Sequence, residues 1–158
     1  MAVLKKSELS ASLEDYLEAI FNLTGEAEAA RSKEIAKVLG VSKASVTGAL
    51  RVLKHKGLVN YKPYDSVTLT NVGQEAAVEI VQKHHILKSF FINVLGVEPE
   101  IGQKAACKAE HALGPEISTR LLSFIKFITE SNGTGGDVAN KFKKFYKKNL
   151  KASKKSRK

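Results

Sequence analysis

The chain has 158 residues, of which 43% are hydrophobic, so it suits one or two globular domains and excludes wholesale disorder. No apolar run approaches the roughly 18 residues of a membrane span, and the N-terminus lacks the apolar core of a signal peptide. With a single cysteine, no internal disulfide can form. We therefore expect a cytoplasmic protein without a membrane partner.

The first predicted helix begins at Ser12 and ends at Gly25. Asp15 follows Ser12 by three residues, which gives an imperfect capping box. Asp15 and Glu18 are three residues apart and share one face of the helix. Two acids in the first turns of a helix ordinarily favour its dipole, and this is the simpler interpretation of the pair.

A helix-turn-helix is predicted between Ser32 and Lys56. Gly40 breaks the first helix, and Ser42 stands where the second helix needs an N-cap. Gly57 follows the second helix as a C-cap residue. A merely structural helix pair is the alternative interpretation of this segment.

A β-hairpin is predicted directly after the second helix, with strands over about residues 58–61 and 66–70 and the turn sequence Lys-Pro-Tyr-Asp between them. Helix, tight turn, helix and hairpin form the pattern of a winged helix-turn-helix. In that motif the second helix enters the DNA major groove.

The outer face of the second helix carries small and polar residues instead of the Glu/Lys mixture of a solvated face. Small residues allow close approach to DNA, and Arg51 can reach a phosphate or a guanine edge. The residues expected to contact double-stranded operator DNA are Ser42, Lys43, Ala44, Ser45, Thr47, Gly48, Arg51 and, on the wing, Lys62.

Three further helices are predicted over about residues 72–95, 100–112 and 115–128. His84 lies within the apolar stripe of the first of them, where a histidine is more often a hydrogen-bonded core residue than a ligand. The last helix has an apolar surface broad enough to be buried on two sides, such as a core and a subunit interface.

Cys107, Glu110 and His111 share one face of the second of these helices, and Gln103 lies one turn earlier on it. A thiolate, a carboxylate and an imidazole together form half of a site for a divalent metal ion. The alternative is a buried small thiol beside an exposed Glu and His.

The C-terminal segment carries the basic character of the chain. Residues 141–158 hold nine Lys, one Arg and no acidic residue, so they account for the whole net charge of +10. Residues 132–136 predict a flexible Gly-rich break, followed by a basic amphipathic helix capped by Asp137. Its lysines could contact DNA phosphates, form a solvated face over docked aromatics, or lie on a membrane.

Over about residues 13–128 the chain resembles the diphtheria toxin repressor family of metal-dependent transcription regulators. The motifs that carry the resemblance are LEDYLEAIFNL, SKASVTGALRVLKHKGLV, TLTNVGQEAA and C-x-x-E-H. The resemblance implies a mainly α fold. Its parts are a winged helix-turn-helix over residues 1–71, a helical metal-binding and dimerisation domain over 72–131, and a Gly hinge with a basic tail over 132–158.

The resemblance further implies a repressor that binds operator DNA as a homodimer when Fe²⁺ or Mn²⁺ occupies a site between these two domains. The implied ligands are Asp15, Glu18, His84, Cys107, Glu110 and His111. The manganese branch of the family has Glu at the position of Cys107, and the iron branch has Met at that of Asp15. The chain therefore mixes two patterns, and its thiolate also leaves Zn²⁺ possible.

The family's ancillary iron site has Glu and His where this chain has Lys88 and Gln103, so we expect that version of the site to be absent. Two other functions remain open: a winged-helix repressor that senses no metal, and a helical metalloenzyme. The wing and the lack of obvious substrate-handling residues count against the enzyme. We therefore expect a protein that is not an enzyme and has no small-molecule substrate.

Overall fold

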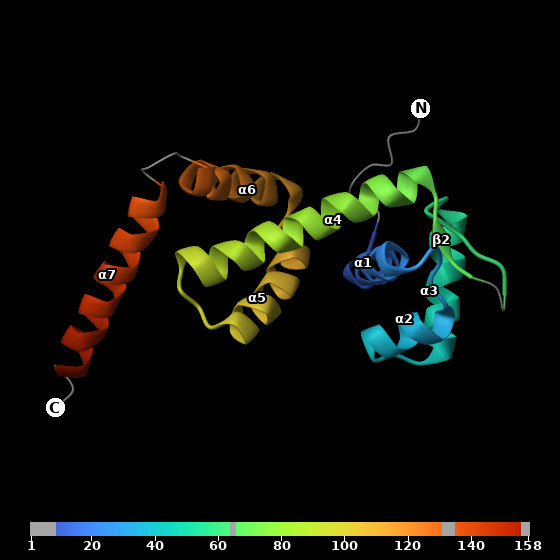
Figure 1. Ribbon diagram of the computed structural model, residues 1–158, viewed down its shortest axis with the longest axis horizontal. Helices are drawn as coiled ribbons and strands as arrows, with labels where there is room; N and C mark the ends of the chain where they lie inside the picture. Colours follow the sequence, from blue (N-terminus) through green and yellow to red (C-terminus); the bar gives the residue numbers. More distant parts are fainter. Residues whose placement is uncertain (1–8, 64–65, 131–134, 156–158) are drawn as a thin grey trace. The chain divides into compact units, whose positions relative to one another are not determined.

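The structure is a computed structural model that describes residues 9–63, 66–130 and 135–155, in two compact units, Met1–Gln82 (unit 1) and Lys83–Lys158 (unit 2). The expected mainly α fold with a small two-stranded wing is confirmed (Figure 1). The elements in chain order are α1 (Ala11–Glu26), α2 (Ser32–Leu39), α3 (Lys43–His55), β1 (Val59–Asn60), β2 (Thr68–Leu69), α4 (Asn71–Ser89), η1 (Phe90–Val94), α5 (Pro99–Ala112), α6 (Pro115–Glu130) and α7 (Gly135–Lys155).

Helix α1 begins earlier than predicted. The Oγ of Ser10 accepts a hydrogen bond from the backbone N–H of Leu13 at 3.3 Å, so Ser10 is the N-cap. The prediction that Ser12 caps this helix was wrong, because a second serine two residues upstream occupies the cap. The helix also continues through Gly25 to Glu26.

The turn between α2 and α3 confirms its prediction. Gly40 adopts the left-handed conformation, with φ 65° and ψ 32°, which glycine reaches without the steric cost of a Cβ. The Oγ of Ser42 accepts from the backbone N–H of Ser45 at 3.1 Å and caps α3. Gly57 follows α3 with a φ of 73°. These backbone preferences fix where α3 starts and stops.

The wing is shorter than the hairpin predicted from sequence. β1 and β2 pair antiparallel, with Val59 opposite Leu69, and a separate bridge joins Ala30 to Val67. This bridge ties the wing to the segment between α1 and α2. The predicted turn includes residues 64–65, which lie outside the described residues.

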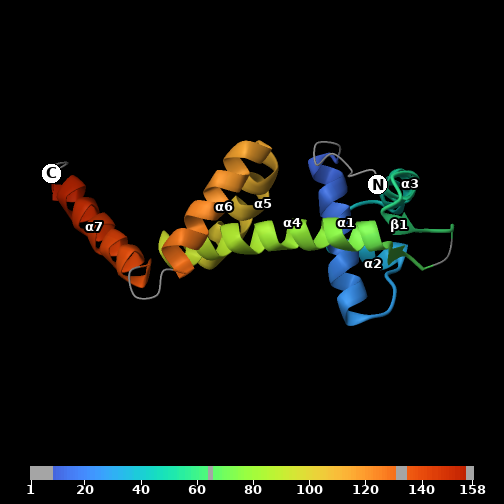
Figure 2. The same ribbon diagram turned by 90° about the horizontal axis from the view of Figure 1, so that it is seen from above.

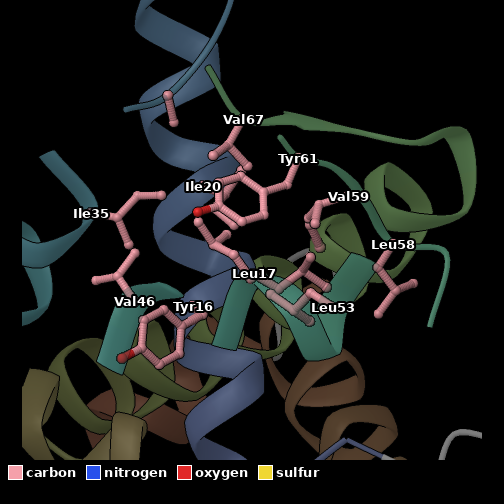
Figure 3. Packing of buried hydrophobic residues seen from close by; sticks show 13 residues of the cluster. Tyr16, Leu17, Ile20, Ile35, Val46, Leu53, Leu58, Val59, Tyr61 and Val67 are labelled. Carbon is pink, nitrogen blue, oxygen red and sulfur yellow. The ribbon is translucent and has the colours of Figure 1, made fainter. Parts of the chain in front are cut away.

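The core of unit 1 joins side chains from α1, α2, α3, the wing and the start of α4 (Figure 3). Leu17 and Ile20 supply it from α1, and Leu50 and Leu53 from α3, all without solvent exposure. Burial of such residues from separate elements is the main force that holds α3 against the rest of the unit.

Thr70 fastens the base of the wing to α4. Its Oγ1 donates to the carbonyl of Gly57 at 2.7 Å and accepts from the backbone N–H of Gly73 at 3.0 Å. A Cβ built on Gly73 would lie 1.8 Å from the carbonyl oxygen of Leu58. The first turn of α4 therefore approaches the wing more closely than any residue with a side chain permits.

The core of unit 2 forms around Leu87, which packs with Ala106 of α5 and Ile125 of α6. Both views show α5 and α6 beside the C-terminal part of α4 (Figures 1 and 2). The single long helix predicted over residues 72–95 was wrong in its last turn, because α4 changes to the π-helix η1 at Phe90. A Cβ on Gly102 would lie 2.7 Å from Cγ1 of Ile92, so α5 lies very close to η1.

Helix α7 confirms the predicted basic helix but not its cap. It begins at Gly135, so Asp137 lies inside it instead of before it. Residues 132–134 of the predicted Gly-rich break lie outside the described residues. Within the part of the chain that the structure describes, no helix is both long and apolar enough to span a bilayer.

The close approach at Gly73 gives a stability prediction. Gly73→Ala should lower the free energy of unfolding by about 3 kcal/mol, because the methyl group must displace the Leu58 backbone. Urea unfolding of the metal-free protein measures this. Gly48→Ala is the matched control: no atom lies within 4 Å of the added methyl, and this helical position gains about 1 kcal/mol of propensity. Equal stability of Gly73→Ala and the parent would contradict the close packing.

Candidate functional site

Glu110 of α5 is the centre of a polar cluster in unit 2. It is 1% exposed, yet it is ionisable. Its Oε2 lies 3.1 Å from Nδ1 of His84 on α4, and its Oε1 lies 3.3 Å from Nε2 of His111. A buried carboxylate is costly unless polar partners surround it; the contact of Oε2 with His84 offsets part of this cost, while Oε1 is buried and makes no hydrogen bond to any described residue.

Cys107 adds a sulfur donor to the same face of α5. Its Sγ, a carboxylate oxygen of Glu110 and a ring nitrogen of His111 lie within 4.8 Å of one another. The sequence placed these three residues on one helical face, and the structure brings their donor atoms together. Thiolate, carboxylate and imidazole at this separation fit a divalent transition metal such as Fe²⁺, Mn²⁺ or Zn²⁺.

Gln103 completes the cluster on its outer side. Its Nε2 lies 2.9 Å from Nε2 of His84. If the Gln103 amide donates to that nitrogen, the imidazole proton resides on Nδ1 and is donated to Glu110. His84 is thus a hydrogen-bonded histidine, as its apolar surroundings suggested, and it also faces the predicted metal ligand Glu110. Sequence spacing placed Gln103 on this face but did not reveal its contact with His84.

Asp15 and Glu18 belong to unit 1, where they project from α1. Both are partly buried, while Tyr16, Leu17 and the other inward residues of the helix are buried in the core. Their role as metal ligands stays a prediction.

The predicted DNA-contacting face of α3 is open to solvent. Ser42, Lys43, Ala44, Ser45, Gly48 and Arg51 are exposed, and Thr47 is partly buried. The Oγ1 of Thr47 donates to the carbonyl of Lys43 at 3.0 Å, and Ser42 and Ser45 share a hydrogen bond of 2.9 Å. Val46, Leu50 and Leu53 are buried on the opposite side. This division leaves α3 held by its apolar side and free to present the polar one.

The wing lies next to the C-terminal end of α3. Between them is a shallow cleft of ≈ 510 Å³, lined among others by Lys54 and Lys62. Both lysines are exposed. Two ammonium groups beside this cleft are suited to a DNA phosphate backbone.

Family comparison identifies both halves of the chain. Residues 8–67 match the iron dependent repressor N-terminal DNA binding domain, and residues 70–135 match the iron dependent repressor metal binding and dimerisation domain. The chain belongs to the iron-dependent repressor family. It is therefore a DNA-binding, metal-dependent transcriptional repressor, and its family comprises regulators instead of enzymes.

Relatives extend over most of the chain. A helix-turn-helix regulator from Methanocaldococcus jannaschii is 40% identical over 75% of this chain and 95% of its own length. The transcriptional regulator MntR of Salmonella typhimurium is 34% identical over 79% of this chain and 76% of its own. A solved manganese-dependent transcriptional repressor in complex with manganese aligns with a TM-score of 0.62 and 30% identity, over 73% of this chain and 53% of that one.

The exposed face of α3 and the wing should affect DNA binding differently. Substituting Thr47 by Val should change the preferred DNA sequence, because side chains on a recognition helix contact base edges. Lys62→Ala should weaken binding to all sequences alike. It should also lower the salt slope, which is the steepness with which the logarithm of the DNA-binding constant falls with the logarithm of the salt concentration, by about 0.9 for each phosphate that is no longer neutralised. Selection from a randomised duplex library with Mn²⁺, followed by titration in NaCl, measures both.

Lys104→Ala provides the control for Lys62→Ala, since Lys104 is an exposed lysine of α5 in unit 2. It should change neither the preference nor the slope. If the Thr47 variant selected the same sequences as the parent, Thr47 would not contact bases.

Proposed function

We propose that the chain acts as a homodimer that binds operator DNA when Fe²⁺ or Mn²⁺ occupies the cluster around Glu110. The proposed ligands are Asp15, Glu18, His84, Cys107, Glu110 and His111. The proposed DNA contacts are those of α3 and Lys62. We also propose the domain boundaries near residues 71 and 131, and the cytoplasm as the location.

The observation that supports the metal site best is the buried carboxylate of Glu110, which is 1% exposed and lies between two histidines. Buried carboxylates flanked by imidazoles are uncommon as purely structural features, because their desolvation is expensive. They are usual where a cation is to be bound. The family's description of residues 70–135 as metal binding supports the same assignment.

A metal ion must compete with the contacts that the ligands already make. His84 can bind metal through a ring nitrogen only by giving up its hydrogen bond to Glu110 or to Gln103. A metal that binds imidazole nitrogen and thiolate sulfur weakly would not repay that loss. The site should therefore favour transition metals over Ca²⁺ or Mg²⁺.

Metal binding can change DNA affinity only if the metal prefers the conformation that binds DNA. Ligands from α1 in addition to those from α4 and α5 would give the metal that preference, because it would then bind best to a single arrangement of these helices.

Homodimer formation is supported by the outer surface of α6. Ile117, Phe124 and Phe127 are 59%, 54% and 71% exposed in the single chain. Three large apolar side chains on one helix are a common mark of a protein interface. Two subunits would place two copies of α3 on a duplex, as paired half-sites require.

The decisive experiment is an anaerobic DNA-binding assay at fixed salt that compares Fe²⁺, Mn²⁺, Zn²⁺ and a chelator. Stronger sequence-specific binding with Fe²⁺ or Mn²⁺ than with the chelator supports the proposal. Tight specific binding that the chelator does not change would favour a repressor that senses no metal.

Glu110→Gln should weaken metal binding by at least about tenfold, because even the loss of a residue that only orients a ligand commonly costs that much. Metal-activated DNA binding should be lost with it. Isothermal titration with Mn²⁺ measures the affinity. Glu100→Gln is the matched control on the same helix, since Glu100 is an exposed acid in the first turn of α5. Parent-like metal affinity in Glu110→Gln would refute the assignment, provided its circular dichroism spectrum is unchanged.

Cys107→Glu tests what sets the choice of metal. A thiolate favours softer ions such as Fe²⁺ and Zn²⁺, and a carboxylate favours Mn²⁺. The variant should therefore bind Mn²⁺ more tightly relative to Zn²⁺ than the parent does, by about tenfold or more. A titration in which the two ions compete for the protein, followed with a metal-sensitive dye, measures the ratio of the Mn²⁺ and Zn²⁺ affinities. An unchanged ratio would show that Cys107 is not a ligand.

A further inference from the structure

Helix α7 separates its charged and apolar residues into two halves. With 3.6 residues per turn, the positions of Lys141, Lys143, Lys144, Lys147 and Lys148 all fall within one half of the helix. The large apolar residues of the same stretch fall on the other half, and they are Val138, Phe142, Phe145, Tyr146 and Leu150. The spacing of Lys151, Lys154 and Lys155 continues the charged half. The lysines are therefore arranged as a surface, not as an unordered tail.

One edge of α7, at Phe142 and Lys143, is partly buried in its own unit, while Val138, Phe145, Tyr146 and Leu150 are exposed. Helix α7 contacts α6 and η1, and a Cβ on Gly96 would lie 3.5 Å from Cε of Lys143. Phe142 is partly buried, and its ring stacks on Tyr146 with centroids 6.1 Å apart. The helix thus has an anchored edge, while Lys144, Lys147 and Lys148 are exposed.

The rest of the chain carries no net positive charge. Outside residues 141–158 it has 16 basic and 16 acidic residues, so its formal charge is zero. Non-specific DNA binding depends on lysines and arginines that displace counterions from phosphates. In this protein the net positive charge comes from residues 141–158, that is, from α7 and the residues after it.

We propose that the lysine face of α7 is a second DNA-binding surface, which contacts phosphates without regard to sequence and raises affinity for any duplex. Charge complementarity selects this occupant: a row of ammonium groups on one side of a helix matches the densely charged DNA backbone. The proposal depends on DNA binding by the family and not on which metal activates it.

An anionic membrane would also attract such a helix. However, membrane binding of an amphipathic helix requires its apolar face to enter the lipid. In α7 most of that face is exposed, with Phe145 63% and Tyr146 52% exposed, but a single helix without a lipid anchor binds membranes only marginally. The exposed lysines of α7 favour DNA as the ligand, because the DNA-binding family already brings this chain to a duplex.

The test compares the parent protein with the full-length variant K144Q/K147Q/K148Q. Glutamine is a good helix former, so the variant removes three positive charges from α7 of each subunit without favouring its unfolding. The matched control is K144R/K147R/K148R, which keeps the charges at the same positions. The probe is a random-sequence 30-base-pair duplex, titrated between 50 and 300 mM NaCl, with Mn²⁺ and with chelator. The Gln variant should bind at least about tenfold more weakly at 100 mM NaCl, and its salt slope should fall by at least about two units in a dimer.

The Arg control should keep the parent affinity and slope. The ratio of DNA affinity with Mn²⁺ to that with chelator should be the same in all three proteins, which separates this surface from the metal site. A parent-like slope in the Gln variant overturns the proposal. If that variant instead loses co-sedimentation with phosphatidylserine vesicles while its DNA slope is unchanged, the lysine face serves a membrane.

Discussion

The contact of one buried carboxylate with two imidazoles is the constraint on which the metal-binding half depends. Glu110 is 1% exposed, with His84 3.1 Å from one of its oxygens and His111 3.3 Å from the other. That pairing requires α4 and α5 to lie at one separation and one rotation. The apolar contacts around Leu87 maintain the same arrangement from the other side. Packing and polar chemistry therefore support each other in this cluster.

The DNA-binding half reaches its precision by different means. It depends on local backbone geometry and on hydrogen bonds between side chains and the backbone. These are the left-handed glycine before α3, the serine that caps α3, and the hydroxyl of Thr70, which is hydrogen-bonded to both Gly57 and Gly73. These features order α3 and the wing without any metal. Unit 1 thus offers a preformed surface to DNA. We therefore expect metal binding to change the positions of the two α3 helices of a dimer and not the conformation of α3 itself. A preformed surface also avoids the entropic cost of ordering on binding.

Much of this organisation could be predicted from the sequence, because helix spacing and cap residues are local signals. The turn at Gly40, the cap at Ser42 and the shared face of Cys107 and Glu110 needed only neighbours in the chain. The first cap was misplaced because Ser10 and Ser12 are both good caps, and only the tertiary position of the helix decides between them. The π-helix at Phe90 and the link from Gln103 to His84 depend on contacts between helices, which spacing alone does not encode.

Gly102 contributes no ligand, yet it lies where α5 packs very closely on η1. A methyl group at this position would lie 2.7 Å from Cγ1 of Ile92, so the Ile92 side chain would have to shift or α5 would have to move away from η1. If α5 moved, Glu110, eight residues later, would be carried with it and away from the ring of His84. Selection on metal sensing should therefore act on a residue that no search for ligands would find. A variant collection screened for an impaired metal response would be expected to recover substitutions here alongside those in the donors themselves.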